Sequence, residues 1–123
     1  MKTALIIEDN ADNRELISFI LEKNGYKTLR AETGEKGVDI ALNEMPDFVI
    51  LDIQLPGIDG YEVLRRIRSS EVGGSIPVIA VTSYAMSGDR EKLMAAGCSG
   101  YIEKPIDPER IIDQIREVIE NNS

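Results

Sequence analysis

The sequence predicts an α/β fold: a doubly wound, five-stranded parallel sheet in (βα)5 order, with helices on both faces. Three observations lead to this fold class. Short apolar runs alternate along the chain with stretches whose apolar residues recur at helical spacing. The main runs are apolar at every position, which is typical of strands buried on both faces of a parallel sheet. Crossovers between parallel strands are almost always right-handed, so the helices can cover both faces.

Five segments are expected to form the strands. Three are continuous apolar runs, at residues 4–7, 48–51 and 78–81. Two are weaker candidates with only a few apolar residues, at 27–32 and 100–103. A helical pattern follows each segment, so the predicted order is five successive βα units.

Four apolar stripes and one weaker segment predict the helices. The stripes are Leu16, Ile17, Ile20 and Leu21; Val38, Ala41, Leu42 and Met45; Val63, Leu64 and Ile67; and Ile111, Ile112, Ile115, Val118 and Ile119. The weaker segment is 89–96, and its helix is expected to begin anywhere from Tyr84 to Asp89. Gly25 and Gly97 follow helical stretches, where a left-handed cap is favoured.

The last helix has a clear expected start. Asp107 is a favourable N-cap residue, Pro108 suits the first turn, and Glu109 places a carboxylate where the helix dipole favours it. The helix is expected to end at about Glu120.

Length and composition limit the possible functions. The 123 residues fit one domain, and the formal net charge of -8 disfavours direct binding to nucleic acids. No apolar run approaches the ~20 residues that cross a bilayer, and the N-terminal apolar stretch is too short for a signal peptide. We therefore expect no membrane contact and a cytoplasmic location.

With no histidine and one cysteine, the chain cannot form a Ser-His-Asp triad, a histidine-based zinc site or an intramolecular disulfide.

Chemically active side chains stand where the predicted strands end. The first strand ends in Glu8 and Asp9, the third in Asp52, the fourth in Thr82, and the last leads to Lys104. Ligands of open parallel sheets bind beyond the carboxyl ends of the strands, near the point where the strand order reverses. Three carboxylates, a hydroxyl and an ammonium group are therefore expected to meet at one edge.

Three neighbouring carboxylates repel one another unless a cation lies between them. Mg²⁺ takes oxygen ligands and is held by one or two carboxylates together with water, so Asp9 and Asp52 could bind it directly and Glu8 through water. Lys104 can pair with Asp52 when no phosphoryl group is present. A carboxylate can also attack phosphorus to form an aspartyl phosphate. Catalysis would then consist of positioning and charge neutralisation by Mg²⁺, Lys104 and Thr82.

At these positions the sequence resembles the receiver domain of two-component response regulators. The resemblance rests on the Glu8-Asp9 pair, the segment 52–60 (DIQLPGIDG), the segment 82–86 (TSYAM) and the segment 101–105 (YIEKP). It covers the whole chain, with every motif in the expected order. It implies the flavodoxin-like topology of that family and one receiver domain over residues 1–123, without an output domain.

The resemblance also implies roles around the acceptor. Asp52 resembles the phosphoacceptor and Asp9 a direct metal ligand, while Glu8 would assist through water and the backbone carbonyl of Gln54 would complete the Mg²⁺ ligands. Thr82 and Lys104 resemble the residues that bind the phosphoryl oxygens.

Further positions resemble the family's switch and its turns. Tyr101 is similar to the aromatic residue that turns inward when Thr82 moves. Pro56 and Gly60 are expected to serve the turn after Asp52, and the Lys104-Pro105 bond is expected to be cis, as in the family. Ser83 and Tyr84 depart mildly from the family pattern and bear on the lifetime of the phosphoryl group.

The function implied is a signalling switch. A histidine kinase or histidine phosphotransferase would supply the phosphoryl group in trans, with Mg²⁺ as cofactor, and a downstream effector protein would bind the last two βα units. The chain would be no enzyme beyond assisting its own phosphorylation and dephosphorylation. Without an output domain it would act as a phosphate shuttle, an allosteric adapter or a motor-binding messenger.

Two other functions fit parts of the sequence. A Mg²⁺-dependent phosphatase of the haloacid-dehalogenase type would usually have a second Asp two positions after its nucleophile, where this chain has Gln54. A flavin- or nucleotide-binding module on the same fold would want a Gly-rich or hydroxyl-rich loop after the first strand, where this chain has Glu8 and Asp9.

Several residues also have an ordinary structural explanation. Asp9 alone could cap the first helix, and Tyr101 could simply pack in its strand. Asp52 is harder to explain in this way, because a buried unpaired carboxylate is costly. Cys98 is expected to be a small buried apolar residue, and Met86 and Met94 are most simply explained by packing.

Overall fold

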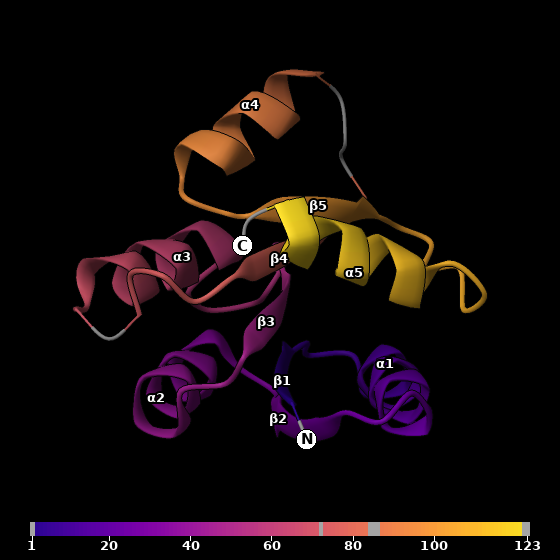
Figure 1. The fold of residues 1–123 in the computed structure, drawn as a ribbon. Coiled ribbons are helices and arrows are strands. Elements are labelled where there is room, and N and C mark those ends of the chain that lie inside the picture. The colour runs from indigo at the N-terminus through magenta and orange to yellow at the C-terminus, as the bar shows by residue number, and fades with distance from the viewer. Residues whose placement is uncertain (1, 72, 84–86, 122–123) are drawn as a thin grey trace.

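The protein forms a parallel sheet between two layers of helices (Figure 1), as a computed structural model of residues 2–71, 73–83 and 87–121 shows. In these ranges the elements are β1 (Thr3–Ile7), α1 (Ala11–Lys23), β2 (Lys27–Ala31), α2 (Gly34–Glu44), β3 (Phe48–Asp52), α3 (Gly60–Ser69), β4 (Val78–Thr82), α4 (Ser87–Ala95), β5 (Gly100–Glu103) and α5 (Ile111–Asn121). The predicted order of five βα units is confirmed. None of the helices in the described ranges has the length and apolar character needed to span a membrane.

The strand order is β2-β1-β3-β4-β5, and every neighbouring pair is parallel. The order reverses between β1 and β3, because the chain leaves β1 toward β2 on one side and later returns to β3 on the other. In Figure 1, α1 and α5 cover one face of the sheet, while α2, α3 and α4 cover the other. The carboxyl ends of β1 and β3 therefore lie side by side at the switch point of the sheet.

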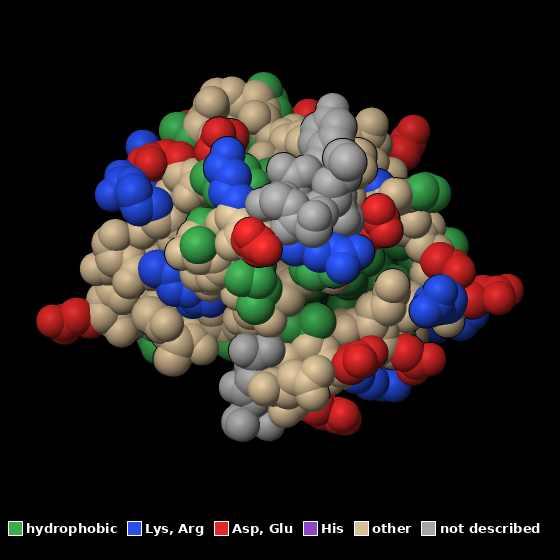
Figure 2. Space-filling model, turned by 90° about the horizontal axis from the view of Figure 1, so that it is seen from above, with side chains coloured by type: hydrophobic (Ala, Val, Ile, Leu, Met, Phe, Trp, Pro, Cys, Tyr) green, Lys and Arg blue, Asp and Glu red, His purple; other side chains and the backbone are tan. Residues whose placement is uncertain are grey.

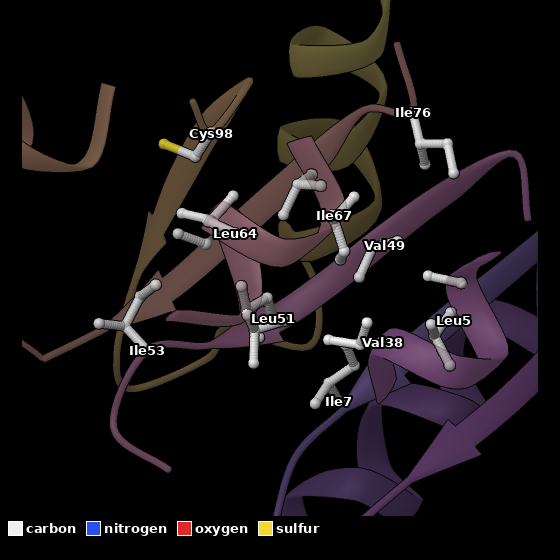
Figure 3. Packing of buried hydrophobic residues seen from close by; sticks show 14 of the residues in the cluster. Leu5, Ile7, Val38, Val49, Leu51, Ile53, Leu64, Ile67, Ile76 and Cys98 are labelled. Atoms are coloured by element: carbon white, nitrogen blue, oxygen red, sulfur yellow. The ribbon is translucent and has the colours of Figure 1, made fainter. Parts of the chain in front are cut away.

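The core consists of two hydrophobic clusters, one on each side of the sheet. The first lies under α2 and α3 and includes Leu5, Val49 and Leu51 (Figure 3). The second lies under α1 and α5 and includes Ile6 and Ile50. Neighbouring residues of one strand thus enter opposite clusters, as the two-residue period of a strand requires. This explains why the strands read as continuous apolar runs.

Two predicted core residues are exposed. Leu16 is 36% exposed and Met45 is 57% exposed, so their assignment to the buried stripes is wrong. On α1 the buried stripe is centred on Ile17 and Leu21, and the face that carries Leu16 turns to the solvent. Met45 lies beyond the end of α2, where it caps the helix with a left-handed φ of 48° and leaves the helical stripe.

The helix boundaries differ in detail from those expected. The Asp107 carboxylate accepts a hydrogen bond from the backbone N–H of Glu109 at 3.0 Å, so it caps a turn that precedes the helix and is not the N-cap of the regular helix. The regular helix begins at Ile111 and ends at Asn121. Gly25 and Gly97 have left-handed φ values of 90° and 106°, which confirms both predicted caps. Tyr84 and Met86, for which we also had expectations, lie outside the described residues.

Candidate functional site

The three predicted acidic residues meet at the switch point of the sheet. Glu8 and Asp9 follow β1, and Asp52 is the last residue of β3. One carboxylate oxygen of each residue lies within 4.8 Å of the other two. Glu8 and Asp52 are buried, at 2% and 3% exposure, whereas Asp9 is exposed. The site therefore has two buried carboxylates and one that is exposed to solvent.

The turn that carries Glu8 and Asp9 is fixed by both of its neighbours. The backbone N–H of Glu8 donates to the carbonyl of Ala31 at 3.0 Å, so hydrogen bonding to β2 continues one residue past β1. The Arg14 guanidinium donates to the carbonyl of Glu8 at 2.9 Å and to that of Asp9 at 3.4 Å. The sequence analysis missed Arg14; the only signal was a cation one turn into the helix after the acidic pair.

Asp9 does not cap the first helix. Asn10 is the N-cap of α1, and its side-chain oxygen accepts from the backbone N–H of Asn13 at 2.9 Å. The alternative interpretation of Asp9 as a helix cap is therefore wrong, and its carboxylate lies with those of Glu8 and Asp52 instead.

Lys104 pairs with Asp52, as predicted. Its Nζ donates to Asp52 Oδ1 at 3.2 Å, and the same oxygen accepts from the backbone N–H of Gln54 at 2.9 Å. The backbone N–H of Lys104 donates to the carbonyl of Thr82 at 2.8 Å, which fixes the lysine beside the end of β4. The Lys104-Pro105 bond is cis, as expected.

The carboxylate cluster is electrostatically unfavourable as it stands. Burial, a hydrogen bond with Asp52 and repulsion from the Asp52 carboxylate raise the pKa of Glu8 from 4.5 to about 8. Lys104 opposes this shift but does not cancel it. Three oxygen-donor side chains within reach of one another, two of them buried, fit a small divalent cation such as Mg²⁺. The donor set and its excess negative charge therefore suit the predicted cofactor.

Thr82 and Tyr101 lie on the adjacent strands. Thr82 is the last residue of β4 and is buried, at 2% exposure. Tyr101 is in β5, opposite Ala80, and its partly buried ring packs against the first cluster. The Arg90 guanidinium lies 5.3 Å from the centre of that ring. Thr82 thus stands between the acidic site and the strand that carries Tyr101.

The turn after Asp52 depends on two glycines. Gly57 has a left-handed φ of 76°, a role that the sequence analysis did not assign, whereas Pro56 is exposed in the same turn. Gly60 serves a close approach of two backbone segments instead: a Cβ there would lie 2.5 Å from the Cα of Ile53. The backbone N–H of Gly60 donates to the carbonyl of Ile53 at 3.0 Å.

Cys98 and Met94 are not part of the carboxylate cluster. Cys98 is buried, as expected, and burial raises the pKa of its thiol. Met94 is 50% exposed, yet it packs against Cys98, which agrees with its explanation by packing. The Met94 sulfur lies 3.7 Å from the Cys98 sulfur, because the two residues are one helical turn apart.

The family model for the response regulator receiver domain matches residues 4–116. The chain is 41% identical over 118 residues to the polar-differentiation response regulator DivK of Brucella ovis, with 96% of each chain covered. It also resembles the receiver domain of the sensor histidine kinase PA1611 from Pseudomonas aeruginosa, with a TM-score of 0.87 and 33% identity over 97% of this chain and 98% of that one. That structure holds a magnesium ion in its active site cleft.

The fold itself is shared more widely. The chemotaxis response regulator CheY4 of Vibrio cholerae matches with a TM-score of 0.92 at 24% identity, covering 96% of this chain and 98% of that one. At this identity the likeness supports the fold alone, which is the predicted doubly wound sheet. The family match over residues 4–116 and the 41% identity with a response regulator also assign the chain to a protein family. The chain belongs to the response regulator receiver domain family.

Proposed function

We propose that this chain is a phosphorylation-dependent switch of a two-component system, with Asp52 as the phosphoacceptor. Receiver domains are signalling switches rather than classical enzymes. One observation carries the assignment to Asp52: its buried carboxylate is the meeting point of the acidic cluster and of Lys104. A histidine kinase or histidine phosphotransferase is the donor, because the chain has no histidine of its own.

Four groups would hold the Mg²⁺. The carboxylates of Asp9 and Asp52 and the backbone carbonyl of Gln54 are the proposed direct ligands, and Glu8 acts through water. When bound, the ion neutralises negative charge on the transferring phosphoryl group. Two of the carboxylates are already buried close to each other in the folded protein. Much of the free energy needed to remove them from water is therefore spent on folding and not on binding the ion.

The residues around Asp52 support the transfer step. A carboxylate oxygen of Asp52 forms the new bond to phosphorus, while the bond between phosphorus and the donor's histidine nitrogen breaks and its electron pair stays on that nitrogen. Lys104 already bonds Asp52 and would move to a phosphoryl oxygen, and the Thr82 hydroxyl would donate to another. Both groups thereby stabilise charge where it accumulates.

A groove beside the acceptor suits the donor protein. It has a volume of about 430 Å³ and is lined by Asn13, Leu16, Ser83, Lys104, Pro105 and Ile106. Leu16 is the residue that was expected in the core and is instead exposed here. A donor that covers this groove would bring its phosphohistidine next to Lys104 and exclude water from Asp52.

A second groove, on the last two βα units, suits the downstream effector. It has a volume of about 460 Å³ and is bordered by α4, β5 and α5, with Arg90, Tyr101 and Gln114 among its lining residues. Because Tyr101 belongs to this surface, a change in its ring position would alter what a partner protein meets.

Covalent labelling tests the proposal. Incubation with Mg²⁺ and a small acyl phosphate should add one phosphoryl group that hydroxylamine removes, as it removes acyl phosphates from carboxylates. Asp52→Asn should abolish labelling because it removes the nucleophile, whereas Asp39→Asn, at an exposed carboxylate on α2, should leave it intact. Intact-mass measurement gives the count. Labelling that persists in Asp52→Asn, or that resists hydroxylamine, would place the acceptor elsewhere.

A further inference from the structure

Helix α4 is attached to the rest of the molecule by few buried side chains. Among its side chains that the structure describes, only Leu93 is buried, and Arg90 and Lys92 are exposed. Figure 1 shows α4 at the top of the molecule, beside β5. Seen from that side, charged side chains of both signs stand among exposed hydrophobic ones (Figure 2). Individual surface contacts therefore matter more for the position of α4 than for the other helices.

Two of these contacts join a cation of α4 to an aromatic ring. The Lys92 Nζ lies 4.6 Å from the centre of the Tyr61 ring, which belongs to α3. The Arg90 guanidinium lies 5.3 Å from the centre of the Tyr101 ring, which belongs to β5. Residues two apart on a helix point about 200° away from each other, so the two rings hold α4 on opposite flanks. Both rings pack against the first hydrophobic cluster.

Tyr61 is connected through the backbone to the phosphoacceptor. It follows Gly60, whose N–H donates to the carbonyl of Ile53 at 3.0 Å. A Cβ on Gly60 would lie 2.5 Å from the Ile53 Cα and 3.1 Å from the carbonyl oxygen of Asp52. The start of α3 is thus in direct contact with the residue that accepts the phosphoryl group, so a shift of that backbone reaches Tyr61 without passing through Thr82.

We infer that the contact between Tyr61 and Lys92 is a latch that holds α4 in the unphosphorylated arrangement and opens when Asp52 is phosphorylated. The inference rests on the proposed function. In this structure Lys104 bonds Asp52 directly, which is the arrangement without a phosphoryl group. Because the two rings flank α4 on opposite sides, a displacement of the helix toward the Tyr101 ring would move Lys92 away from the Tyr61 ring. The latch gives Asp52 a second route to α4.

Binding of beryllofluoride, a phosphoryl mimic, measures the latch in the presence of Mg²⁺. A contact that exists only in the unliganded arrangement opposes binding, so its removal must tighten binding. Lys92→Met and Tyr61→Leu should each bind about threefold more tightly, which corresponds to about 0.7 kcal/mol, a usual strength for an exposed cation–π contact. The double variant should bind no more tightly than either single variant.

Two control variants separate the latch from simpler effects. Lys23→Met removes the same charge from the cation–π pair with Phe19 on α1 and should leave the affinity unchanged. Tyr61→Phe keeps the ring and should behave like the unsubstituted protein. The contrary result is that Lys92→Met and Tyr61→Leu lower the free energy of unfolding and leave the affinity for beryllofluoride unchanged. That result would show that the contact is present with and without the mimic, and it would overturn the latch but not the proposed function. Failure of the unsubstituted protein to bind beryllofluoride would overturn the proposed function, and the latch with it.

Discussion

Glu8 is the residue whose ionisation opposes the fold most directly. Its pKa is raised to about 8 by burial and by the neighbouring Asp52, compared with 4.5 for an exposed glutamate. Between these two values the folded protein binds more protons than the unfolded chain does. The free energy of unfolding must therefore fall as pH rises through this range when no divalent cation is present.

This sign gives a prediction for stability. Without Mg²⁺, the free energy of unfolding should fall by on the order of 2–4 kcal/mol between pH 5 and pH 8.5. Glu8→Gln should flatten the dependence, because the amide does not ionise, and millimolar Mg²⁺ should flatten it in the unsubstituted protein by compensating the charge. Urea unfolding followed by circular dichroism at several pH values measures both effects. An undiminished fall in Glu8→Gln would show that another group is responsible.

Individual residues also show which parts of the site a sequence can reveal. Asp52 and Lys104 could be predicted because strand ends are visible as the ends of apolar runs, and parallel strands bring those ends to one edge. The role of Arg14 could not, because it depends on the path of the turn at Glu8 and Asp9. Leu16 was misplaced because two adjacent apolar residues leave the direction of a helical stripe ambiguous.

Among the elements, the segment between β3 and α3 is closely constrained by its neighbours. Gly60 begins α3 in contact with the backbone of Ile53, and this contact places Tyr61 under Lys92. The strands β1, β3 and β4 were clearly predictable because both of their faces are buried. The contact between α3 and α4 was not, since it joins residues whose spacing in the sequence carries no periodic signal.

A pair of glycine substitutions tests this constraint. Gly60→Ala should lower the free energy of unfolding by about 1–3 kcal/mol, because its Cβ would meet the Ile53 backbone, which cannot move aside easily. Gly74→Ala is the matched control: the nearest atom to its Cβ would be 3.6 Å away, an ordinary contact. Thermal or urea unfolding compares the two. Equal stabilities would mean that the chain at Gly60 relaxes freely.

For the molecule as a whole, the proposed switch requires that phosphorylation at one edge of the sheet alters the arrangement of β4, β5, α4 and α5. Thr82 is buried at the end of β4, and the chain after it leads to α4. Tyr101 and Tyr61 contact α4 from two sides. Removal of the Thr82 hydroxyl should therefore weaken the response without abolishing attachment of the phosphoryl group.

Hydrogen exchange measures this response directly. Thr82→Ala should still be labelled on Asp52, yet beryllofluoride should change exchange across residues 90–121 less than it does in the unsubstituted protein. A residual response is expected from the route through Gly60 and Tyr61, and adding Lys92→Met should reduce it further. A full response in Thr82→Ala would show that the hydroxyl does not couple the site to the last two βα units.

The two hydrophobic clusters on either side of the sheet have an evolutionary consequence. Leu16 and Ile106, in the groove proposed for the donor, come from α1 and from the chain beside the second cluster. Tyr61 and Tyr101, which contact α4, pack against the first cluster. The sheet thus separates the groove proposed for the donor from the two tyrosine rings that contact α4. Mutations in the donor groove would therefore have little effect on these two rings, so a lineage could change its phosphoryl donor while the contacts of Tyr61 and Tyr101 with α4 are inherited unchanged.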